Sequence, residues 1–435
     1  DLDAGDTIYY RLRIGSNGET NAYNVTLADT LPVEVSSPTI DSVAGGGFGT
    51  ADFEVDGGVV QVDDTVHAEG ITIPPGTTVD VIISATLDVD VEPGQLIRNS
   101  DATVGWTSMD DGTTAGEVAT QRSTHNSNST ERHDTADNPA PADIETADLA
   151  LDKSLIDTSA SSTSGANVII GEIVTYQLDI ELIEGNSDNV VVGDTLPAGL
   201  VFVDTVSING DTAAPYTDAA PFDYADIPAG NTPAAGDNDL MWTIGDVTNA
   251  ADNDAGNNTL SIVYRAQLAD GVLPATPTSR DLDNTATLDY ELADGSSAPQ
   301  QADDDTVTLI QPELGIAKSA DPVDGSIVDD EGGTTIQYTL TVTNTGDAPA
   351  YDAKVRDVIP DGMRSGGIAA ITVDSITVNG AAAALKNPEP NANFDSDGVA
   401  LWDFDDGATA NTYTINAGAT LVLVYSVQVD DGIGG

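Results

Sequence analysis

Cysteine is absent from this chain of 435 residues, so neither disulfide bonds nor thiolate metal sites can stabilise it. Any covalent link between its strands must use another chemistry. Aromatic residues make up only 5% of the chain, which argues against deep aromatic pockets. No run of 18 or more apolar residues occurs, so the sequence predicts no membrane span.

Basic residues are scarce as well: 13 Lys and Arg stand against 73 Asp and Glu, giving a net charge of −60. Nucleic acid and anionic membrane surfaces would repel this chain, because both are bound through cationic side chains. The acidic side chains must be screened by salt or neutralised by cations, and calcium prefers such oxygen ligands. These conditions favour an extracellular protein, secreted or held at the cell surface.

One succession of segments occurs three times along the chain. Each copy contains a D-x-[LI]-P turn, and the aspartates of these turns are Asp29, Asp194 and Asp357, about 165 residues apart. The segments alternate apolar with polar residues and are bounded by Gly, Pro, Asn or Asp, which is typical of strands. We therefore predict an all-β protein of tandem immunoglobulin-like antiparallel β-sandwiches.

The repeats divide the chain into three parts. Residues 1–146 hold a first sandwich without its opening strand, followed by a polar segment, 107–146, which is expected to be a long loop or linker. Residues 147–311 hold a complete second sandwich. Residues 312–435 hold a third sandwich that stops before its closing strand.

Three polar residues of the second repeat are expected to point into the core. Residues i and i+2 of a strand share a face. At these positions Lys153, Asp194 and Asn284 have only apolar neighbours. Lys318, Asp357 and Asp29 occupy matching positions in the other repeats, and Lys318 is likewise expected to point inward.

Burial of these groups favours their neutral forms, since it lowers the pKa of a lysine and raises that of an aspartate. A neutral Lys153 could attack Cγ of Asn284 while Asp194, as the acid, polarises the amide. Ammonia would leave and an isopeptide bond would join the first and last strands. The alternatives are a non-covalent Lys153–Asp194 contact or a wrong assignment of the faces.

The repeats resemble a known family. The pattern is a Lys in the first strand, Y-x-[LI]-x-[VI], V-x-D-x-[LI]-P-x-G-[LM] and a final N-x-A-x-[LV]-x-Y. It resembles the conserved surface-protein repeat called domain of unknown function eleven, and is similar to isopeptide-forming domains of fimbrial shaft proteins. The resemblance covers nearly the whole chain. It implies immunoglobulin-like or collagen-binding-protein-like sandwiches of cell-surface adhesins and pilins.

The resemblance also implies roles for individual residues. Lys153 would be the nucleophile, Asp194 the catalytic acid and Asn284 the acceptor. Lys318 and Asp357 would be the equivalents in the third repeat, with an acceptor beyond residue 435. Asp29 would be the equivalent acid in the first repeat, with its lysine before residue 1.

The acceptor of the first repeat is left open by the sequence. Alignment of Ala102 with Ala286 places Ser100 at the position of Asn284. A bulge would place Asn99 there instead, or this repeat lacks the bond.

The segment ADNDAGNN offers a candidate calcium site in Asp252, Asp254 and Asn257, with Gly256 permitting a tight turn. It does not have the full EF-hand spacing, and a solvated acidic loop is the alternative. No G-x-S-x-G, P-loop or HExxH motif occurs, so no enzyme is expected beyond a single self-cross-linking reaction.

These features predict a structural repeat region of an extracellular fibre, pilus-like filament or cell-surface stalk. Its partners would be neighbouring repeats of the same chain or further copies along a fibre. The alternative is an adhesin whose loops bind a glycan or protein ligand.

Overall fold

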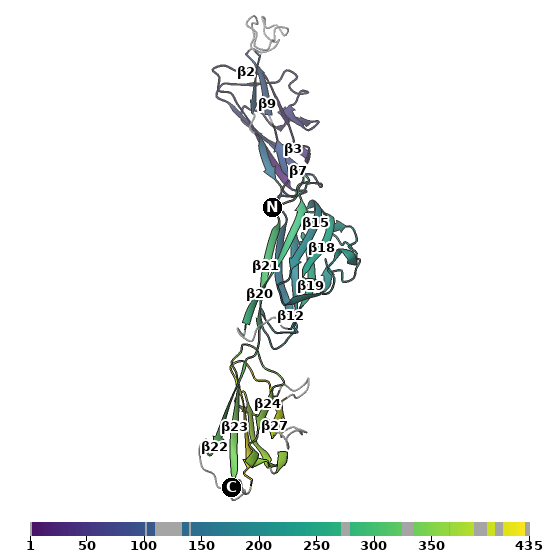
Figure 1. Cartoon of the computed structure of the whole chain (residues 1–435). Helices are drawn as coiled ribbons and strands as arrows, with labels where there is room; N and C mark the ends of the chain where they lie inside the picture. Colours follow the sequence, from purple (N-terminus) through teal and green to yellow (C-terminus); the bar gives the residue numbers. More distant parts are fainter. Residues whose placement is uncertain are drawn as a thin grey trace, which may run out of the picture.

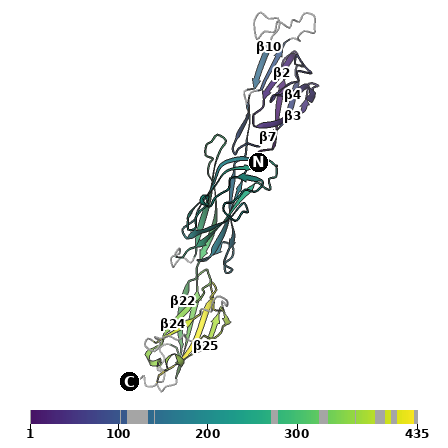
Figure 2. The same cartoon turned by 90° about the vertical axis from the view of Figure 1, so that its right-hand side faces the viewer.

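The computed structural model describes most of the chain. The residues described are 2–100, 102–108, 133–138, 141–270, 279–323, 334–364, 366–386, 398–404 and 412–430. Within these ranges the regular structure consists of β-strands and short 3₁₀ turns. Three β-sandwiches follow one another along the long axis of the molecule, in chain order, and both views agree on this elongated shape (Figure 1, Figure 2). The prediction of an all-β chain of antiparallel sandwiches is confirmed.

The second domain is the most complete of the three. One sheet has the order β12 (Ala150–Thr158), β14 (Ile173–Glu181), β19 (Thr259–Leu268) and β16 (Leu200–Ile208). The other has the order β13 (Asn167–Val168), β21 (Gln301–Ile310), β20 (Ser279–Glu291), β15 (Gly185–Thr195), β18 (Asp239–Asn249) and β17 (Phe222–Tyr224). The inner faces of the two sheets enclose the core, because successive side chains of each strand point to opposite faces.

The first domain repeats this plan without a counterpart of β12. Its first sheet has the order β1 (Thr7–Gly15), β7 (Thr78–Leu87) and β3 (Val35–Ala44). The opposite sheet runs β10 (His133–Asn138), β9 (Ala102–Thr107), β2 (Ala22–Thr30), β5 (Val59–Val62) and β4 (Phe53–Asp56), with β6 (Ile71–Ile73) on β2. A separate pair joins β11 (Ala142–Glu145) to β8 (Leu96–Asn99).

The prediction that 107–146 is only a loop or linker is wrong. β10 pairs with β9 and β11 pairs with β8, so part of this segment belongs to the first sandwich. β11 and the described side chains of β10, at residues 136–138, are mostly exposed, which hides the alternation that marks half-buried strands. Residues 109–132 lie outside the described part of the chain.

The third domain has one full sheet and a smaller second layer. The sheet has the order β22 (Leu314–Asp321), β23 (Thr335–Asn344), β28 (Thr420–Gln428), β25 (Ile371–Val378) and β26 (Ala381–Ala382). Opposite it lies the pair β24 (Lys354–Val358) and β27 (Val399–Asp403). Among the described strands, none takes the place that β20 and β21 have in the second domain.

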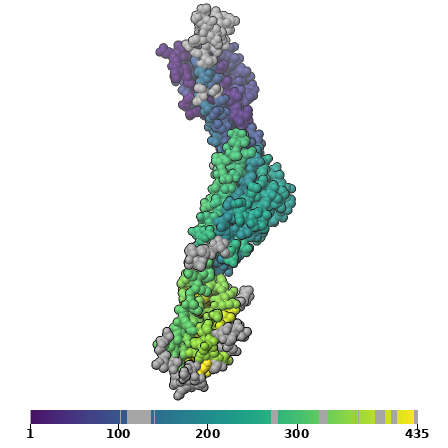
Figure 3. Space-filling model, in the orientation of Figure 1, coloured from purple at the N-terminus to yellow at the C-terminus, as the bar shows by residue number. Residues whose placement is uncertain are grey.

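The space-filling view shows the three domains as successive bodies along a narrow molecule (Figure 3). Each has its own core, and their members span 4–97, 149–309 and 336–429. Backbone hydrogen bonds join the first two domains: the Ala4 amide donates to Glu184 O at 3.0 Å, and the Ala147 amide to Leu2 O at 2.9 Å. The first domain is therefore bonded directly to the second, beyond the chain connection.

Candidate functional site

Four polar side chains from both sheets meet inside the second domain. Lys153 comes from β12 and Tyr264 from β19, whereas Asp194 comes from β15 and Asn284 from β20. Lys153 Nζ donates to Asp194 Oδ2 and, at 3.1 Å, to Tyr264 Oη. Tyr264 Oη donates to Asp194 Oδ2 at 2.7 Å and accepts from Asn284 Nδ2 at 2.8 Å. The tyrosine thus links the amine, the carboxyl and the amide.

The cluster is sealed from solvent. The side chains of Lys153 and Asp194 are 0% exposed, and Asn284 is also 0% exposed. Burial lowers the pKa of Lys153, and the attraction of Asp194 opposes this only in part. Burial likewise raises the pKa of Asp194 against the influence of Lys153. Both shifts favour a neutral amine beside a protonated carboxyl.

Aromatic rings form the walls of this cluster. Lys153 Nζ lies 4.8 Å from the centre of the Tyr176 ring. The Tyr264 ring packs against Tyr176 at 5.5 Å and against Trp242 at 5.3 Å between ring centres. These rings come from core-facing positions of β14, β18 and β19 and leave the polar groups in a low-dielectric surrounding, where electrostatic effects are strong.

Two buried oxygens of the cluster have no hydrogen-bond partner: Asp194 Oδ1 and Asn284 Oδ1. Buried acceptors without a donor are costly, so each of these two oxygens would gain from a nearby proton. A proton on Asp194 Oδ1 would supply a donor for Asn284 Oδ1. The two residues are neighbours across the sheet, since Asp194 faces Ala286, two positions from Asn284.

The backbone of β12 is held beside the Asn284 strand by side chains of β21. Asp303 Oδ2 accepts the Lys153 amide at 2.7 Å, and Asp305 Oδ2 accepts the Leu155 amide at 2.5 Å. Asp305 itself faces Asn284 across β20 and β21. These contacts fix the register in which the lysine reaches the asparagine. Such an arrangement can perform amine attack on an amide, assisted by a carboxylic acid.

Sequence reasoning missed Tyr264. A signal was present, because the segments TLSIVYRAQL and TLVLVYSVQV both place a tyrosine at this position. Alternation alone marks such a residue as a core aromatic. Only the packing of the two sheets brings its hydroxyl to the other three groups.

The third domain holds an open version of the cluster. Lys318 Nζ donates to Asp357 Oδ1 and Oδ2 at 2.8 and 2.7 Å, and Tyr425 Oη donates to Asp357 Oδ2. Lys318 points toward Asp357 of the opposite layer, but its expected burial is wrong: its side chain is 36% exposed, and Ile316 is 60% exposed. The reason is that the described part of this domain has no strands covering that face of β22.

The first domain holds a third version, without a lysine. Asn99 Nδ2 donates to Asp29 Oδ2 at 3.1 Å, and both residues are buried. Ser100 is exposed, because the strand breaks between β8 and β9 and shifts the register. Of the two alternatives left by the sequence, the structure therefore brings Asn99 to the aspartate. Ile83 stands where the other domains have Tyr264 and Tyr425.

The candidate calcium residues lie in one turn of the second domain. Asp252 accepts hydrogen bonds from the Asp254 amide at 3.0 Å and from Asn257 Nδ2 at 3.1 Å. Asp254 Oδ1 accepts from the Gly256 amide at 3.1 Å. Both carboxylates thus already accept hydrogen bonds from within the turn. Calcium binding by Asp252, Asp254 and Asn257 stays a prediction.

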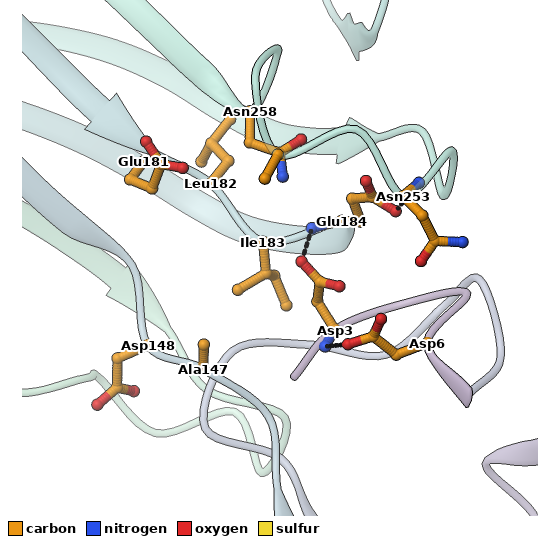
Figure 4. A pocket seen from close by; sticks show the side chains of 11 residues that line it. Asp3, Asp6, Ala147, Asp148, Glu181, Leu182, Ile183, Glu184, Asn253 and Asn258 are labelled. Carbon is orange, nitrogen blue, oxygen red and sulfur yellow. Dashed lines mark hydrogen bonds between the residues drawn. The ribbon is translucent and has the colours of Figure 1, made fainter. Parts of the chain in front are cut away.

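The same turn contributes to the junction with the first domain (Figure 4). The Glu184 carboxylate accepts the amides of Asn253 and Asp254 at 2.9 and 3.1 Å, while Asp3 Oδ2 accepts the Glu184 amide at 3.2 Å. Asp3, Glu184 and Asn253 border a cavity of about 170 Å³. Burial raises the pKa of Asp3, and the charges of Asp6 and Glu184 add to this effect.

One further acidic group escaped the sequence analysis. Within the described ranges, the side-chain oxygens of three acids converge only at Glu54, Asp63 and Asp64. The first residue lies on β4 and the other two follow β5, so the hairpin brings them together. Their spacing matches no metal motif, and exposed acids of this kind carry no conclusion by themselves.

Comparison with known proteins assigns the chain to no family. No family model matches the chain, and no curated protein matches it, so the resemblance to the surface-protein repeat stays a prediction. The chain is similar to the major pilin subunit BcpA of Bacillus cereus, with 10% identity over 96% of this chain and 95% of that one and a TM-score of 0.26. It is similar to the major pilin SpaD of Corynebacterium diphtheriae, with 13% identity over 94% and 80% and a TM-score of 0.24.

A third similar structure is the MSCRAMM ACE of Enterococcus faecalis, with 10% identity over 71% of this chain and 90% of that one and a TM-score of 0.19. Identities this low leave the function to be argued from the residues themselves. No helix in the described ranges has the length and apolar character needed to cross a membrane.

Proposed function

We propose that this chain is a structural segment of an extracellular fibre or cell-surface stalk, and that its second domain closes an isopeptide bond between Lys153 and Asn284. The observation that carries the proposal is the buried cluster in which both residues contact Tyr264 Oη beside Asp194. Domains in a row, as in Figure 1, suit a protein that holds its ends apart. Without cysteine, a lysine–asparagine link takes the part that disulfides play in other extracellular domains.

The reaction balances without a co-reactant. The neutral amine of Lys153 attacks Asn284 Cγ, while the protonated Asp194 donates to the amide oxygen and stabilises the tetrahedral intermediate. The Nζ–Cγ bond forms, the Cγ–Nδ2 bond breaks, and a proton passed through the carboxyl lets nitrogen leave as ammonia. The paired shifts in pKa supply the two protonation states that this requires.

Asp194 is suited to the role of proton donor by its position as well as by its protonation state. Its Oδ2 already receives hydrogen bonds from Lys153 and Tyr264, which leaves Oδ1 to meet the amide oxygen of Asn284. Asp194 Oδ1 can therefore give its proton to the amide oxygen of Asn284, and Asp194 Oδ2 can take a proton from the attacking amine of Lys153. A single carboxyl serves as acid and base.

Intact-mass measurement on the full chain tests the proposal. Bond formation should lower the mass by about 17 Da, the mass of the ammonia released. Proteolysis followed by tandem mass spectrometry should yield a branched peptide that joins Lys153 to Asn284. An unshifted mass, together with linear peptides containing each residue, would contradict the proposal.

The structural role has a separate test. Electron microscopy of the purified chain should show straight, narrow particles with three beads, in line with the outline in Figure 3. Particles collapsed into compact shapes would contradict a role in holding two ends apart.

A further inference from the structure

A cleft lies where the second domain meets the third (Figure 1). It has a volume of about 410 Å³, and small-molecule sites of this size are found preferentially between domains. The second domain borders the cleft with the loop that carries Ser161 and Ser162. The third domain borders it with three loops, which supply Pro349, Tyr351, Asn379, Thr414 and Asn416.

Every residue that lines this cleft is uncharged, although charged residues make up 20% of the chain and its net charge is −60. Tyr351, which is 40% exposed, and Pro349 contribute ring faces, and the other lining residues contribute hydroxyl and amide groups. A charged ligand would find no opposite charge here, and an anion would also meet the repulsion of the acidic surface. The lining therefore suits a neutral ligand that has both hydroxyl groups and apolar faces.

Hydrogen bonds among its own loops hold the third-domain side of the cleft in place. Asn379 Nδ2 donates to Thr414 O at 2.9 Å, and Asn379 Oδ1 accepts the Asn416 amide at 3.1 Å. Ala350 and Ile415 exchange two backbone hydrogen bonds, of 2.9 and 3.0 Å. These bonds join the three loops into one platform.

A buried carboxylate fixes the second-domain side. Glu172 is 3% exposed, and its Oε1 accepts the Ala160 amide and the Thr163 hydroxyl, both at 2.9 Å. These two contacts flank Ser161 and Ser162 and hold both serines at the border of the cleft. A ligand would thus meet preformed groups on both sides, which reduces the entropy lost on binding.

The groups that point to a ligand are five side chains whose hydrogen-bonding capacity is unused. Within the described residues, no hydrogen bond involves the hydroxyls of Ser161, Ser162, Tyr351 and Thr414 or the side-chain amide of Asn416. Hydroxyl and amide groups both donate and accept, as the hydroxyls of a sugar do. A tyrosine ring offers an apolar face beside a polar tip, which matches the C–H face and the hydroxyls of a pyranose ring.

We propose that this cleft binds a neutral oligosaccharide. One pyranose ring lies with its C–H face against Tyr351. Its hydroxyls exchange hydrogen bonds with Thr414 and Asn416 on one side and with Ser161 and Ser162 on the other. Because the ligand contacts both domains at once, it also restrains the joint between them. The site is separate from the isopeptide cluster and does not depend on that bond.

Isothermal titration calorimetry of the full chain tests the proposal. The probes are cellotriose, maltotriose and tri-N-acetylchitotriose, which represent β-linked glucans, α-linked glucans and amino-sugar polymers. We expect saturable binding of at least one of the three, and the preferred probe identifies the kind of polysaccharide. Sialyllactose, which carries a carboxylate, should not bind, because the cleft offers no cation and lies in an acidic surface.

Variants on both sides of the cleft test whether the ligand bridges the two domains. Tyr351→Ala removes the stacking ring and should weaken binding about tenfold. The matched control is Tyr9→Ala, which removes an exposed tyrosine of the first domain and should leave binding unchanged. The double variant Ser161→Ala, Ser162→Ala and the variant Asn416→Ala should each weaken binding about threefold or more. Melting temperatures equal to that of the parent would show that each variant is folded.

Hydrogen exchange on the unaltered protein locates the bound probe without relying on any variant. The preferred probe should slow amide exchange at 159–163 in the second domain and at 414–416 in the third, and should leave β1 unchanged. Binding of none of the three probes would overturn the proposal. So would equal losses of affinity in Tyr351→Ala and Tyr9→Ala, or protection confined to another part of the chain. The mass of the second domain and the shape of the particles are read separately, so these outcomes do not depend on the structural role.

Discussion

Lys153 and Asn284 lie on strands far apart in the sequence, yet both donate a hydrogen bond to one atom, Tyr264 Oη, at 3.1 and 2.8 Å. The same hydroxyl donates its own proton to Asp194 at 2.7 Å. A hydroxyl with one proton and two acceptor sites is then fully used. The tyrosine therefore holds the amine and the amide beside one carboxyl, and changes at the carboxyl and at the hydroxyl should have separable effects.

Replacing the carboxyl should abolish the cross-link. Asp194→Asn keeps the size of the side chain but cannot pass a proton from the amine to the leaving nitrogen. The intact mass of this variant should match its unmodified sequence, without the loss of about 17 Da expected for the parent. Asp204→Asn is the matched control, because that carboxylate is exposed and pairs with Arg265. A persistent mass loss in Asp194→Asn would contradict the assigned role.

Removing the shared hydroxyl should slow the reaction without stopping it. Tyr264→Phe leaves Lys153 and Asp194 in contact but frees Asn284 from its hydrogen bond, so fewer molecules hold the reactive geometry. We expect a rate about tenfold lower or more, measured from the time course of mass loss after cell-free synthesis. Tyr224→Phe removes a hydroxyl that bonds only to the backbone of Thr217 and should leave the rate unchanged. Equal rates for all three proteins would show that Tyr264 is only a packing residue.

The first domain should become more stable relative to its Asp29→Asn variant as the pH falls from neutral. Burial raises the pKa of Asp29 in the folded state, so the folded domain binds the proton more tightly than the unfolded chain. The stability gained is complete below the pKa that Asp29 has in the unfolded chain. It is lost as the pH rises through the higher pKa that Asp29 has in the folded domain. The groups facing this carboxyl, Asn99 and Tyr10, carry no charge in this range, because the pKa of Tyr10 is raised to about 12.

Hydrogen exchange of the β2 and β7 amides, corrected for intrinsic rates, measures this difference at pH 7 and pH 5. The difference between parent and variant should shrink or reverse toward pH 5. The exposed change Asp41→Asn controls for the general fall in acidic repulsion. A difference that is independent of pH would mean that Asp29 stays charged in the folded domain down to pH 5, so that its pKa is not raised into this range.

Calcium should stabilise the second domain beyond the effect of ionic strength. Chelation should lower its melting temperature, and calcium at a hundred times its dissociation constant should add about 2.7 kcal/mol. Sodium chloride at equal ionic strength should restore less, since it screens charge without filling a site. The double variant Asp252→Asn, Asp254→Asn should lose the calcium-specific part. Equal rescue by both salts would exclude a specific site.

Much of the second domain was predictable because its strands are half-buried. Alternation predicted that Lys153, Asp194 and Asn284 point inward, and all three are buried. The same rule placed Lys318 on the side of Asp357 but did not predict its exposure, since alternation gives the face of a residue but not what covers that face. The polar strands β10 and β11 were missed for a related reason, as an exposed strand carries no apolar period.

The missing parts of the prediction depend on packing between segments distant in the sequence. Tyr264 meets Asn284 only when the two sheets close on each other. Asn99 replaces Ser100 beside Asp29 because the strand breaks after β8, a local irregularity that no composition rule indicates. The sequence therefore predicted which residue types would meet, but not every residue that does.

The route of the chain through the second domain has a mechanical consequence. Tension applied along the molecule enters at β12 and leaves at β21, which is bonded to β12 through Asp303 and Asp305. With Lys153 joined to Asn284, the load passes from the opening strand straight into β20 and on to β21. The residues between 153 and 284, which make up most of the sandwich, then lie outside the load-bearing path. The domain would keep its length under a pull that unravels an unlinked sandwich.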